Sequence, residues 1–274
     1  EYKTLEELFL TRNGYTPSKK NPEYWRNGTI PWFRMEDIRA NGRILTQALQ
    51  YVSDKAIKDK PFPANSIIVA TSATIGEHAL LTVESLANQR FTYLILKEQY
   101  RALFDIKFLY YYCFKLDEFC LQHLKLGNFA SVDMSKFAKF LFPIPPLEVQ
   151  QEIVRILDHF TELTEKLNME LIAREQQYNY YLNELLTFHS DIPKMKLGEI
   201  ATQIYRGSGI KRDELESTGI PCVRYGEIYT TYNIWFDQCV SHTSEEKIKN
   251  PKYFEYGDIL FAITGESVED IAKS

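Results

Sequence analysis

The longest regular pattern of apolar and polar positions lies between Ile144 and Phe188. Two prolines open this stretch, which suits the first turn of a helix because the N–H groups there have no partner within the helix. Neither Pro nor Gly interrupts the roughly forty residues that follow, so the helix can continue through them. Apolar side chains then recur at steps of three and four, so they form one stripe of a helix. The stripe consists of Ile153, Ile156, Leu157, Phe160, Leu163, Leu167, Leu171, Tyr178, Tyr181, Leu182 and Leu185.

A helix of this length would be about 60 Å long at ~1.5 Å per residue, which is long for a globular domain. The repeat drifts toward 3.5 residues, although Thr164 and Arg174 interrupt it. We therefore expect a coiled-coil seam that needs a partner helix. The alternative is an unusually long core helix of one domain.

Before this helix, short apolar runs alternate with Gly, Pro and Asn, which is typical of strands and turns. The runs predict strands at 30–34, 66–71, 91–97 and 140–144, and a short helix or strand at 4–10. Helical spacing predicts a helix over 104–126, capped by Gly127, and a helical turn at 134–137. The fold class expected for this part is α/β (α+β).

The sequence after the helix repeats the sequence before it. Residues 5–8 resemble 197–200, residues 28–38 resemble 219–228, and residues 65–70 resemble 257–262, at an offset near 190 to 192. Such a steady offset is hard to obtain by chance, so we interpret the chain as a domain, a long helix and the start of the same domain again. The expected parts are a domain at 1–145, the helix at 146–188, a linker at 189–194 and the second copy at 195–274.

Composition and charge narrow the class of protein. The 274 residues are 45% hydrophobic, which is enough for buried cores. No apolar run has the length of a membrane span, and the start lacks the pattern of a signal peptide, so we expect a cytoplasmic protein with no membrane contact. The net charge of −5 is concentrated in the helix: 3 Lys/Arg and 8 Asp/Glu lie at 147–187, which leaves 29 of each elsewhere. This distribution is compatible with DNA binding outside the helix.

No pattern in the sequence favours catalysis. Residues 21–24, NPEY, and 250–253, NPKY, resemble the NPPY signature of adenine methyltransferases, but they follow lysines rather than an apolar strand and no glycine-rich cofactor loop is present, so they predict turns. The five histidines are scattered and the four cysteines show no CxxC spacing. We therefore expect no catalytic residues, no cofactor and no metal site.

Two loops carry the chemistry of nucleic-acid contact. Residues 12–20 combine Gly and Pro with three cations, hydroxyls and an amide, the groups that bind phosphates and base edges, and residues 205–212 hold the same place in the second copy. A solvated surface loop would explain either one alone; their recurrence favours function. The candidate DNA-binding residues are Arg12, Lys19, Lys20, Arg34, Thr71, Ser72, Thr74, Arg206, Lys211, Arg212 and Arg224.

Four segments carry a resemblance to a known family. The runs GYTPSKKNPEYWRNGTIPWFRMEDI, IIVATSATIG, IPPLEVQQEIVRILDHF and QQYNYYLNELLTF resemble the specificity subunit of type I restriction-modification systems, over essentially the whole chain. The resemblance implies two target recognition domains, each reading half of a split double-stranded DNA sequence, and long conserved helices that bind methyltransferase subunits. It also implies a non-catalytic subunit, because methylation and ATP-driven cleavage belong to the modification and restriction subunits. The alternative is a protein-interaction scaffold without DNA binding, which the acidic balance supports.

The helix and the incomplete repeat lead to two further expectations. Tyr178, Tyr180 and Tyr181 should belong to the methyltransferase interface, because aromatic side chains are frequent interface anchors; the alternative is that they pack on the chain's own domains. The second copy lacks a counterpart of residues 83–144 and of the long helix. We expect a truncated form or fragment whose seam is covered by a second copy in a homodimer or by other subunits.

Overall fold

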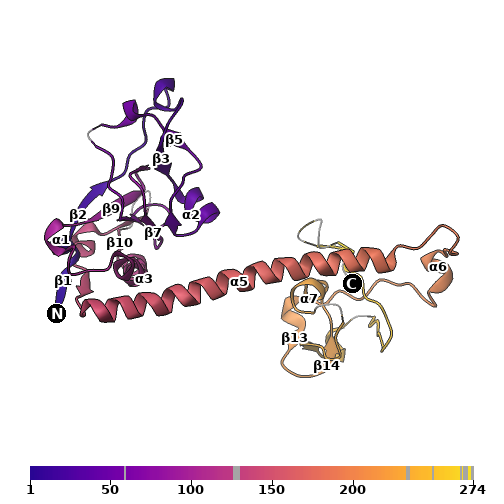
Figure 1. The fold of residues 1–274 in the computed structure, drawn as a ribbon. Helices are drawn as coiled ribbons and strands as arrows, with labels where there is room; N and C mark the ends of the chain where they lie inside the picture. The colour runs from indigo at the N-terminus through magenta and orange to yellow at the C-terminus, as the bar shows by residue number, and fades with distance from the viewer. Residues whose placement is uncertain are drawn as a thin grey trace. The chain divides into compact units, whose positions relative to one another are not determined.

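The computed structural model describes residues 1–58, 60–125, 130–232, 235–248, 250–265, 267 and 271–272. It divides into two compact units, Glu1–Glu184 and Leu185–Ser274 (Figure 1). Within the described residues, every helix is too short or too polar to cross a membrane. Each unit is described by itself below.

The first unit is built around a five-stranded sheet in the order β2-β9-β6-β7-β4. Its strands are β2 (Phe9–Asn13), β9 (Phe91–Leu96), β6 (Ser66–Ala70), β7 (His78–Leu81) and β4 (Ile44–Leu45). All pairs are antiparallel except β4 with β7. A second sheet joins β3 (Ile30–Phe33) to β5 (Tyr51–Val52) and β8 (Leu86–Ala87). The strands predicted at 30–34, 66–71 and 91–97 are confirmed to within one residue, and so is the mixed α/β fold.

Strand β6 is buried along its whole length and contributes to two cores. Ile67 and Val69 lie in the core formed with helix α3 (Ile106–Gln122). Ile68 and Ala70 lie in a second core, with side chains of β3 and β8. Since successive side chains of a strand point to opposite faces, one continuous apolar run serves both. Each fully buried Ile or Val contributes ~1.5–3 kcal/mol, so this strand is central to the stability of the unit.

The remaining elements of the first unit are short. They are α1 (Leu5–Leu8), α2 (Met35–Asn41), α4 (Met134–Phe137), the pair β1 (Tyr2–Thr4) with β12 (Leu141–Pro143), and the pair β10 (Leu124–Lys125) with β11 (Ser131–Val132). The helix predicted over 104–126 was too long at both ends. It begins after Asp105, whose carboxylate accepts a hydrogen bond from Lys107 N at 2.8 Å, and it ends where the chain pairs as β10. Gly127, the expected cap, lies outside the described residues.

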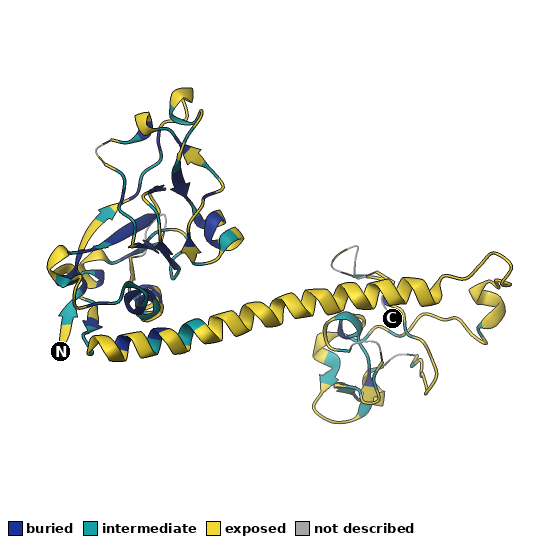
Figure 2. Cartoon of the chain, viewed as in Figure 1, coloured by how far each residue is buried: buried dark blue, intermediate teal, exposed yellow. Residues whose placement is uncertain are grey.

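Helix α5 (Leu147–Leu186) confirms the long helix and shows two different faces. Gln150 and Val154 are buried against the rest of the first unit. Beyond this contact most of the apolar stripe is exposed, with Ile156, Phe160 and Leu163 at 41%, 60% and 39%; most of the helix is yellow in Figure 2. Helical residues three or four apart share a face, so Ile153, the first residue of the stripe, packs against the same core as Val154, and this contact covers only that end of the stripe. The alternative of a helix buried in the core of its own unit is wrong.

The second unit repeats the element order that begins the first. Its α-helices and strands are α6 (Leu197–Ile200), β13 (Leu215–Glu216), β14 (Ile220–Cys222), α7 (Tyr225–Thr230) and β15 (Ser241–Thr243), and two 3₁₀ helices lie at Arg212–Glu214 and Glu245–Lys247. Ile220 pairs with Thr243 as Ile30 pairs with Val52, at offsets of 190 and 191 residues. Residues 257–262, the counterpart of β6, form no strand. In the first unit this run pairs with both β7 and β9. The domain limits expected from the sequence stay a prediction.

Candidate nucleic-acid interface

A chain of polar side chains crosses one end of the main sheet, where β2 and β6 end and β9 begins. Thr92 Oγ1 donates to Asn13 Oδ1 at 3.0 Å, and the hydroxyls of Thr71 and Thr92 lie 2.9 Å apart. Thr71 is only 8% exposed, so its hydroxyl is engaged inside the unit. Ser72 and Thr74 follow it and are half-buried. Of the three hydroxyls selected from the sequence, these two are the accessible ones.

Arg12 lies on β2, not in the loop to which the sequence assigned it. The strand extends to Asn13, and Arg12 pairs with Tyr93 of β9. Its guanidinium lies 4.7 Å from the centre of the Phe62 ring, which in turn stacks on Tyr93. This cation–π contact fixes the half-buried side chain beside the polar end of the sheet.

The loop that carries Lys19 and Lys20 is anchored at its base. A Cβ on Gly14 would lie 2.2 Å from Asn88 O, so the backbone passes there too closely for any other residue. Tyr15 OH donates to Ala56 O and accepts from Lys58 N, both at 3.1 Å. Beyond these contacts both lysines are exposed, and neither forms an ion pair with a described residue. The structure therefore presents two cations on a fixed base.

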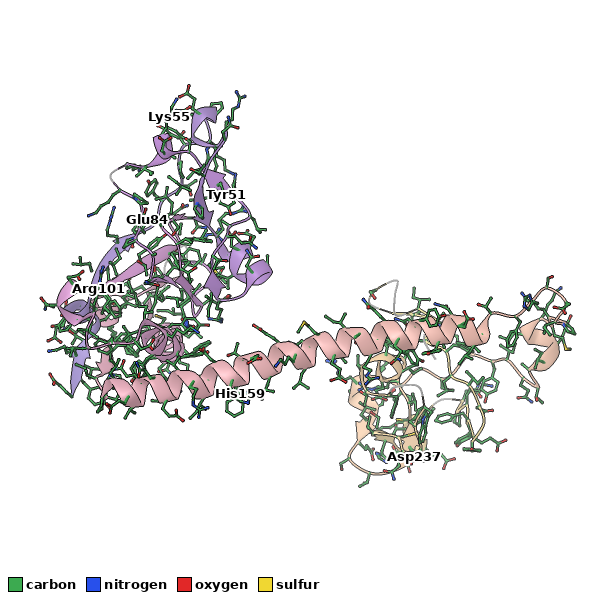
Figure 3. All side chains as sticks on the ribbon, in the orientation of Figure 1. Tyr51, Lys55, Glu84, Arg101, His159 and Asp237 are labelled. Atoms are coloured by element: carbon green, nitrogen blue, oxygen red, sulfur yellow. The ribbon has the colours of Figure 1, made fainter. Side chains whose placement is uncertain are left out.

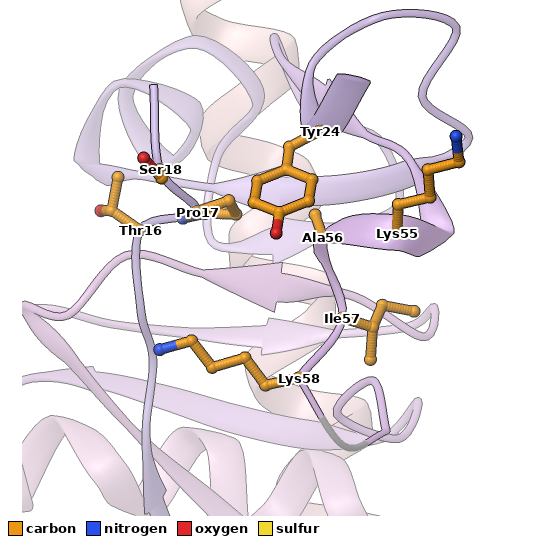
Figure 4. Close-up of a pocket in the computed structure, with 8 residues that line it drawn as sticks. All are labelled: Thr16, Pro17, Ser18, Tyr24, Lys55, Ala56, Ile57 and Lys58. Carbon is orange, nitrogen blue, oxygen red and sulfur yellow. The ribbon is translucent and has the colours of Figure 1, made fainter. Parts of the chain in front are cut away.

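A cavity of about 400 Å³ opens beside this loop (Figure 4). It is lined by Thr16, Pro17, Ser18, Tyr24, Lys55, Ala56, Ile57 and Lys58. Lys58 extends across the cavity toward the loop, whereas Lys55 extends away and pairs with Glu23 at 2.9 Å. Sequence reasoning missed Lys58; the lysines at 55, 58 and 60 were the signal that could have found it.

Arg34 and Arg224 occupy the same structural position in the two units. Each precedes a short helix, α2 or α7, and donates its backbone N–H to a carboxylate three residues later, Asp37 at 2.7 Å and Glu227 at 2.9 Å. The Arg34 guanidinium lies 5.5 Å from the Trp32 ring. Arg224 Nε also donates to Glu227 at 2.8 Å. Both carboxylates are buried, so the backbone of each arginine is fixed; the carboxylate also binds the side chain of Arg224 but not that of Arg34.

The hydrogen bonds around the buried Glu227 carboxyl stabilise its charged form. Burial alone would raise the pKa of its carboxyl, but hydrogen bonds from Arg224 and Ser241 lower it below its ordinary value. The remaining candidates of the second unit, Arg206, Lys211 and Arg212, are exposed. Ser208 donates to Asn250 O at 2.7 Å and so ties the loop to the second Asn-Pro segment.

The first Asn-Pro segment forms a turn, as predicted. Asn21 caps a 3₁₀ helix, Pro22–Tyr24, and accepts a hydrogen bond from Glu23 N at 3.1 Å. Elsewhere in the first unit, His78 and Asp117 form an acid–base pair, with 2.6 Å between Nδ1 and Oδ2. Both are buried within the first unit, so this pair ties β7 to α3 and offers no surface to a substrate.

The three tyrosines selected on α5 are exposed. Tyr178, Tyr180 and Tyr181 are 52%, 62% and 51% accessible, and the rings of the last two lie 5.3 Å apart. His159 also projects from this helix (Figure 3). The described polar contacts of residues 162–182 are all within the helix. Within the first unit, to which they belong, these tyrosines remain accessible to a partner.

Comparison with known proteins finds one family. Residues 1–174 match the type I restriction modification DNA specificity domain. The type I restriction enzyme EcoprrI specificity subunit of Escherichia coli is 53% identical over 241 aligned residues, and the match covers 81% of this chain and 60% of that protein. The EcoR124I/EcoR124II specificity subunit of Escherichia coli is 34% identical over 69% of this chain and 48% of its own length. The chain thus spans about half to three fifths of these relatives.

A solved structure from a study of the assembly and conformational transition of the type I R-M system supports the fold. It aligns with a TM-score of 0.51 at 17% identity and covers 66% of this chain and 43% of its own. At this identity the likeness concerns the fold alone.

Proposed function

Because the chain belongs to the type I restriction-modification DNA specificity family, we propose that it recognises double-stranded DNA, with each unit contributing to one half of a split target. The observation that carries this proposal is the recurrence of one arrangement in both units: an arginine whose backbone N–H is bound by a buried carboxylate, with exposed cations on a preceding loop. Phosphate contacts from such loops position a protein on DNA, and side chains of fixed orientation read bases.

The DNA-contacting face that we propose in the first unit contains the exposed loop lysines, Arg12 and Arg34, and the accessible hydroxyls Ser72 and Thr74. Thr71 contributes only if its pair with Thr92 opens. Lys58 joins this set because it faces the same cavity as the loop. In the second unit the corresponding residues are Arg206, Lys211, Arg212 and Arg224.

The partners that we propose are the modification subunits and, through the complex, the restriction subunit. The exposed tyrosines of α5 would contribute to the modification-subunit interface. The apolar stripe of α5 would bind another long helix, which in a homodimer is the α5 of a second copy. Each stripe residue contributes ~1.5–3 kcal/mol when fully buried, so an exposed stripe favours association.

Catalysis in this proposal belongs to the partner subunits. Among the described residues, no group of His, Cys, Asp and Glu side chains could hold a metal ion. The buried pair His78 and Asp117 lies too deep to act on DNA. We therefore propose a recognition and scaffolding role without a cofactor.

A titration of fluorescent random-sequence duplex with the chain at two salt concentrations tests DNA binding. Phosphate contacts release counterions, so the affinity should fall steeply as salt rises. Binding that is absent at low salt, by a chain that is folded by circular dichroism, would refute the proposal and favour a protein-interaction scaffold.

A further inference from the structure

The first turn of α5 is fixed to the first unit by a single buried amide. Gln150 is 0% exposed. Its Nε2 donates to Leu103 O at 2.9 Å and to Pro145 O at 2.8 Å, and its Oε1 accepts from Asp105 N at 3.0 Å. Leu103 and Asp105 lie in the turn before α3, and Pro145 lies just before α5. One side chain therefore holds three backbone groups in the two segments that lead into these helices.

A second contact lies two turns further along the same face. Asp158 accepts hydrogen bonds from Lys107 Nζ and Tyr111 OH, both at 2.7 Å, and both donors belong to α3. Between the two contacts, Val154 is buried in the core shared with α3. Positions 150, 154 and 158 are spaced by four, so they form one face of the helix. Two polar contacts about 12 Å apart, at ~1.5 Å per residue, prevent both tilting and rotation of the helix.

We propose that Gln150 and Asp158 are positioning residues that fix the direction in which α5 leaves the recognition domain. The proposal rests on the proposed function, because a fixed direction matters where two domains must meet two parts of one DNA target. Gln150 is suited to this role because only an amide offers both the two donors and the acceptor that these backbone groups need. A glutamate of the same shape would place a carboxylate against two carbonyl oxygens.

The matched pair Gln150→Glu and Gln151→Glu tests this assignment in the 274-residue chain. The two substitutions are chemically identical and adjacent, but Gln151 is exposed. Spin labels at Arg39→Cys on α2 and Glu175→Cys on α5, in a Cys239→Ser background, report the distance between domain and helix by double electron–electron resonance. Both label sites are exposed, and the other three cysteines are buried.

We expect a narrow distance distribution for the unsubstituted chain and for Gln151→Glu. The distribution for Gln150→Glu should broaden severalfold, with unchanged helix content by circular dichroism, and it should narrow again at acidic pH, where a neutral carboxyl can donate to one carbonyl. A folded Gln150→Glu chain with the narrow distribution of Gln151→Glu would overturn the proposal.

Two further measurements complete the test. If Gln150→Glu unfolds the first unit, Asp158→Asn replaces it, and a narrow distribution for that variant overturns the proposal instead. Binding of random duplex separates this inference from the proposed function: Gln150→Glu should bind as the unsubstituted chain does, because the DNA-contacting face is untouched. Failure of the unsubstituted chain to bind DNA would refute the function and leave the positioning result standing.

Discussion

Asp37→Ala is the substitution that most directly tests how the first unit fixes the backbone at Arg34. The Asp37 carboxylate is 0% exposed and accepts from Arg34 N at 2.7 Å and from Leu49 N at 2.6 Å. Alanine leaves both N–H groups without this acceptor. A hydrogen bond to a charged group contributes about 1.5–3 kcal/mol, and neighbouring effects are not fully additive, so we expect a loss of about 3–5 kcal/mol in the free energy of unfolding.

Thermal unfolding followed by tryptophan fluorescence measures this loss. Trp25 and Trp32 lie in the same core, with their ring centres 5.0 Å apart. In a domain of this size the melting temperature falls by about 2–4 °C for each kcal/mol of unfolding free energy that is lost. The melting temperature of the first unit should therefore fall by roughly 6–20 °C. The control is Glu36→Ala, because the Glu36 side chain is 61% exposed and its only described ion pair, with Arg34, spans 3.9 Å; we expect a change within about 0.5 kcal/mol. Equal melting temperatures for Asp37→Ala and Glu36→Ala would refute the reasoning.

Three further outcomes are expected. Burial alone would raise the pKa of Asp158, but the hydrogen bonds from α3 hold this pKa below its ordinary value of 3.8. The stabilisation that the Asp158 carboxylate gives is therefore present above about pH 4 and is lost as the pH falls through the lowered pKa. Asp158→Asn should flatten the pH dependence of the melting temperature in that range. Gly14→Ala should destabilise the first unit by at least about 1–3 kcal/mol in urea unfolding, whereas Gly198→Ala, where a Cβ meets nothing within 4 Å, should not. Replacing Lys19 and Lys20 together by Ala should weaken binding to all duplexes and reduce the log–log salt slope by about 1.8 if each neutralises one phosphate; an unchanged slope would exclude them from the interface.

The sequence predicted best the elements whose apolar pattern is continuous. β6, β9 and α5 each combine an apolar run or stripe with clear Gly, Pro or Asn boundaries, and all three are found. β2 was missed as the element that carries Arg12, because it lies at the edge of the sheet and only Phe9 of its five residues is buried. Its partner β9 lies about eighty residues later, and no local pattern records that pairing.

The candidate site was predictable in its chemistry but not in its geometry. The loop lysines and the paired arginines were visible as charges that recur in both copies. That Thr71 points into the unit depends on its register beside Thr92, which only the folded sheet defines. The role of Asp37 depends on Leu49, and that of Gln150 on the turn before α3. In each of these three cases the partner lies on another element, so the amino-acid type alone could not predict the contact.

Selection of duplexes from a random-sequence pool by the 274-residue chain tests the central claim most directly, because it asks for sequence recognition and not only for DNA binding. The proposed function predicts that the recovered duplexes share a short motif, and that Arg34→Ala relaxes the preference at one position by ~1–3 kcal/mol while Lys115→Ala on α3, whose lysine pairs with Glu118, leaves it unchanged. Recovered duplexes without a common motif, from a folded chain at moderate salt, would contradict it.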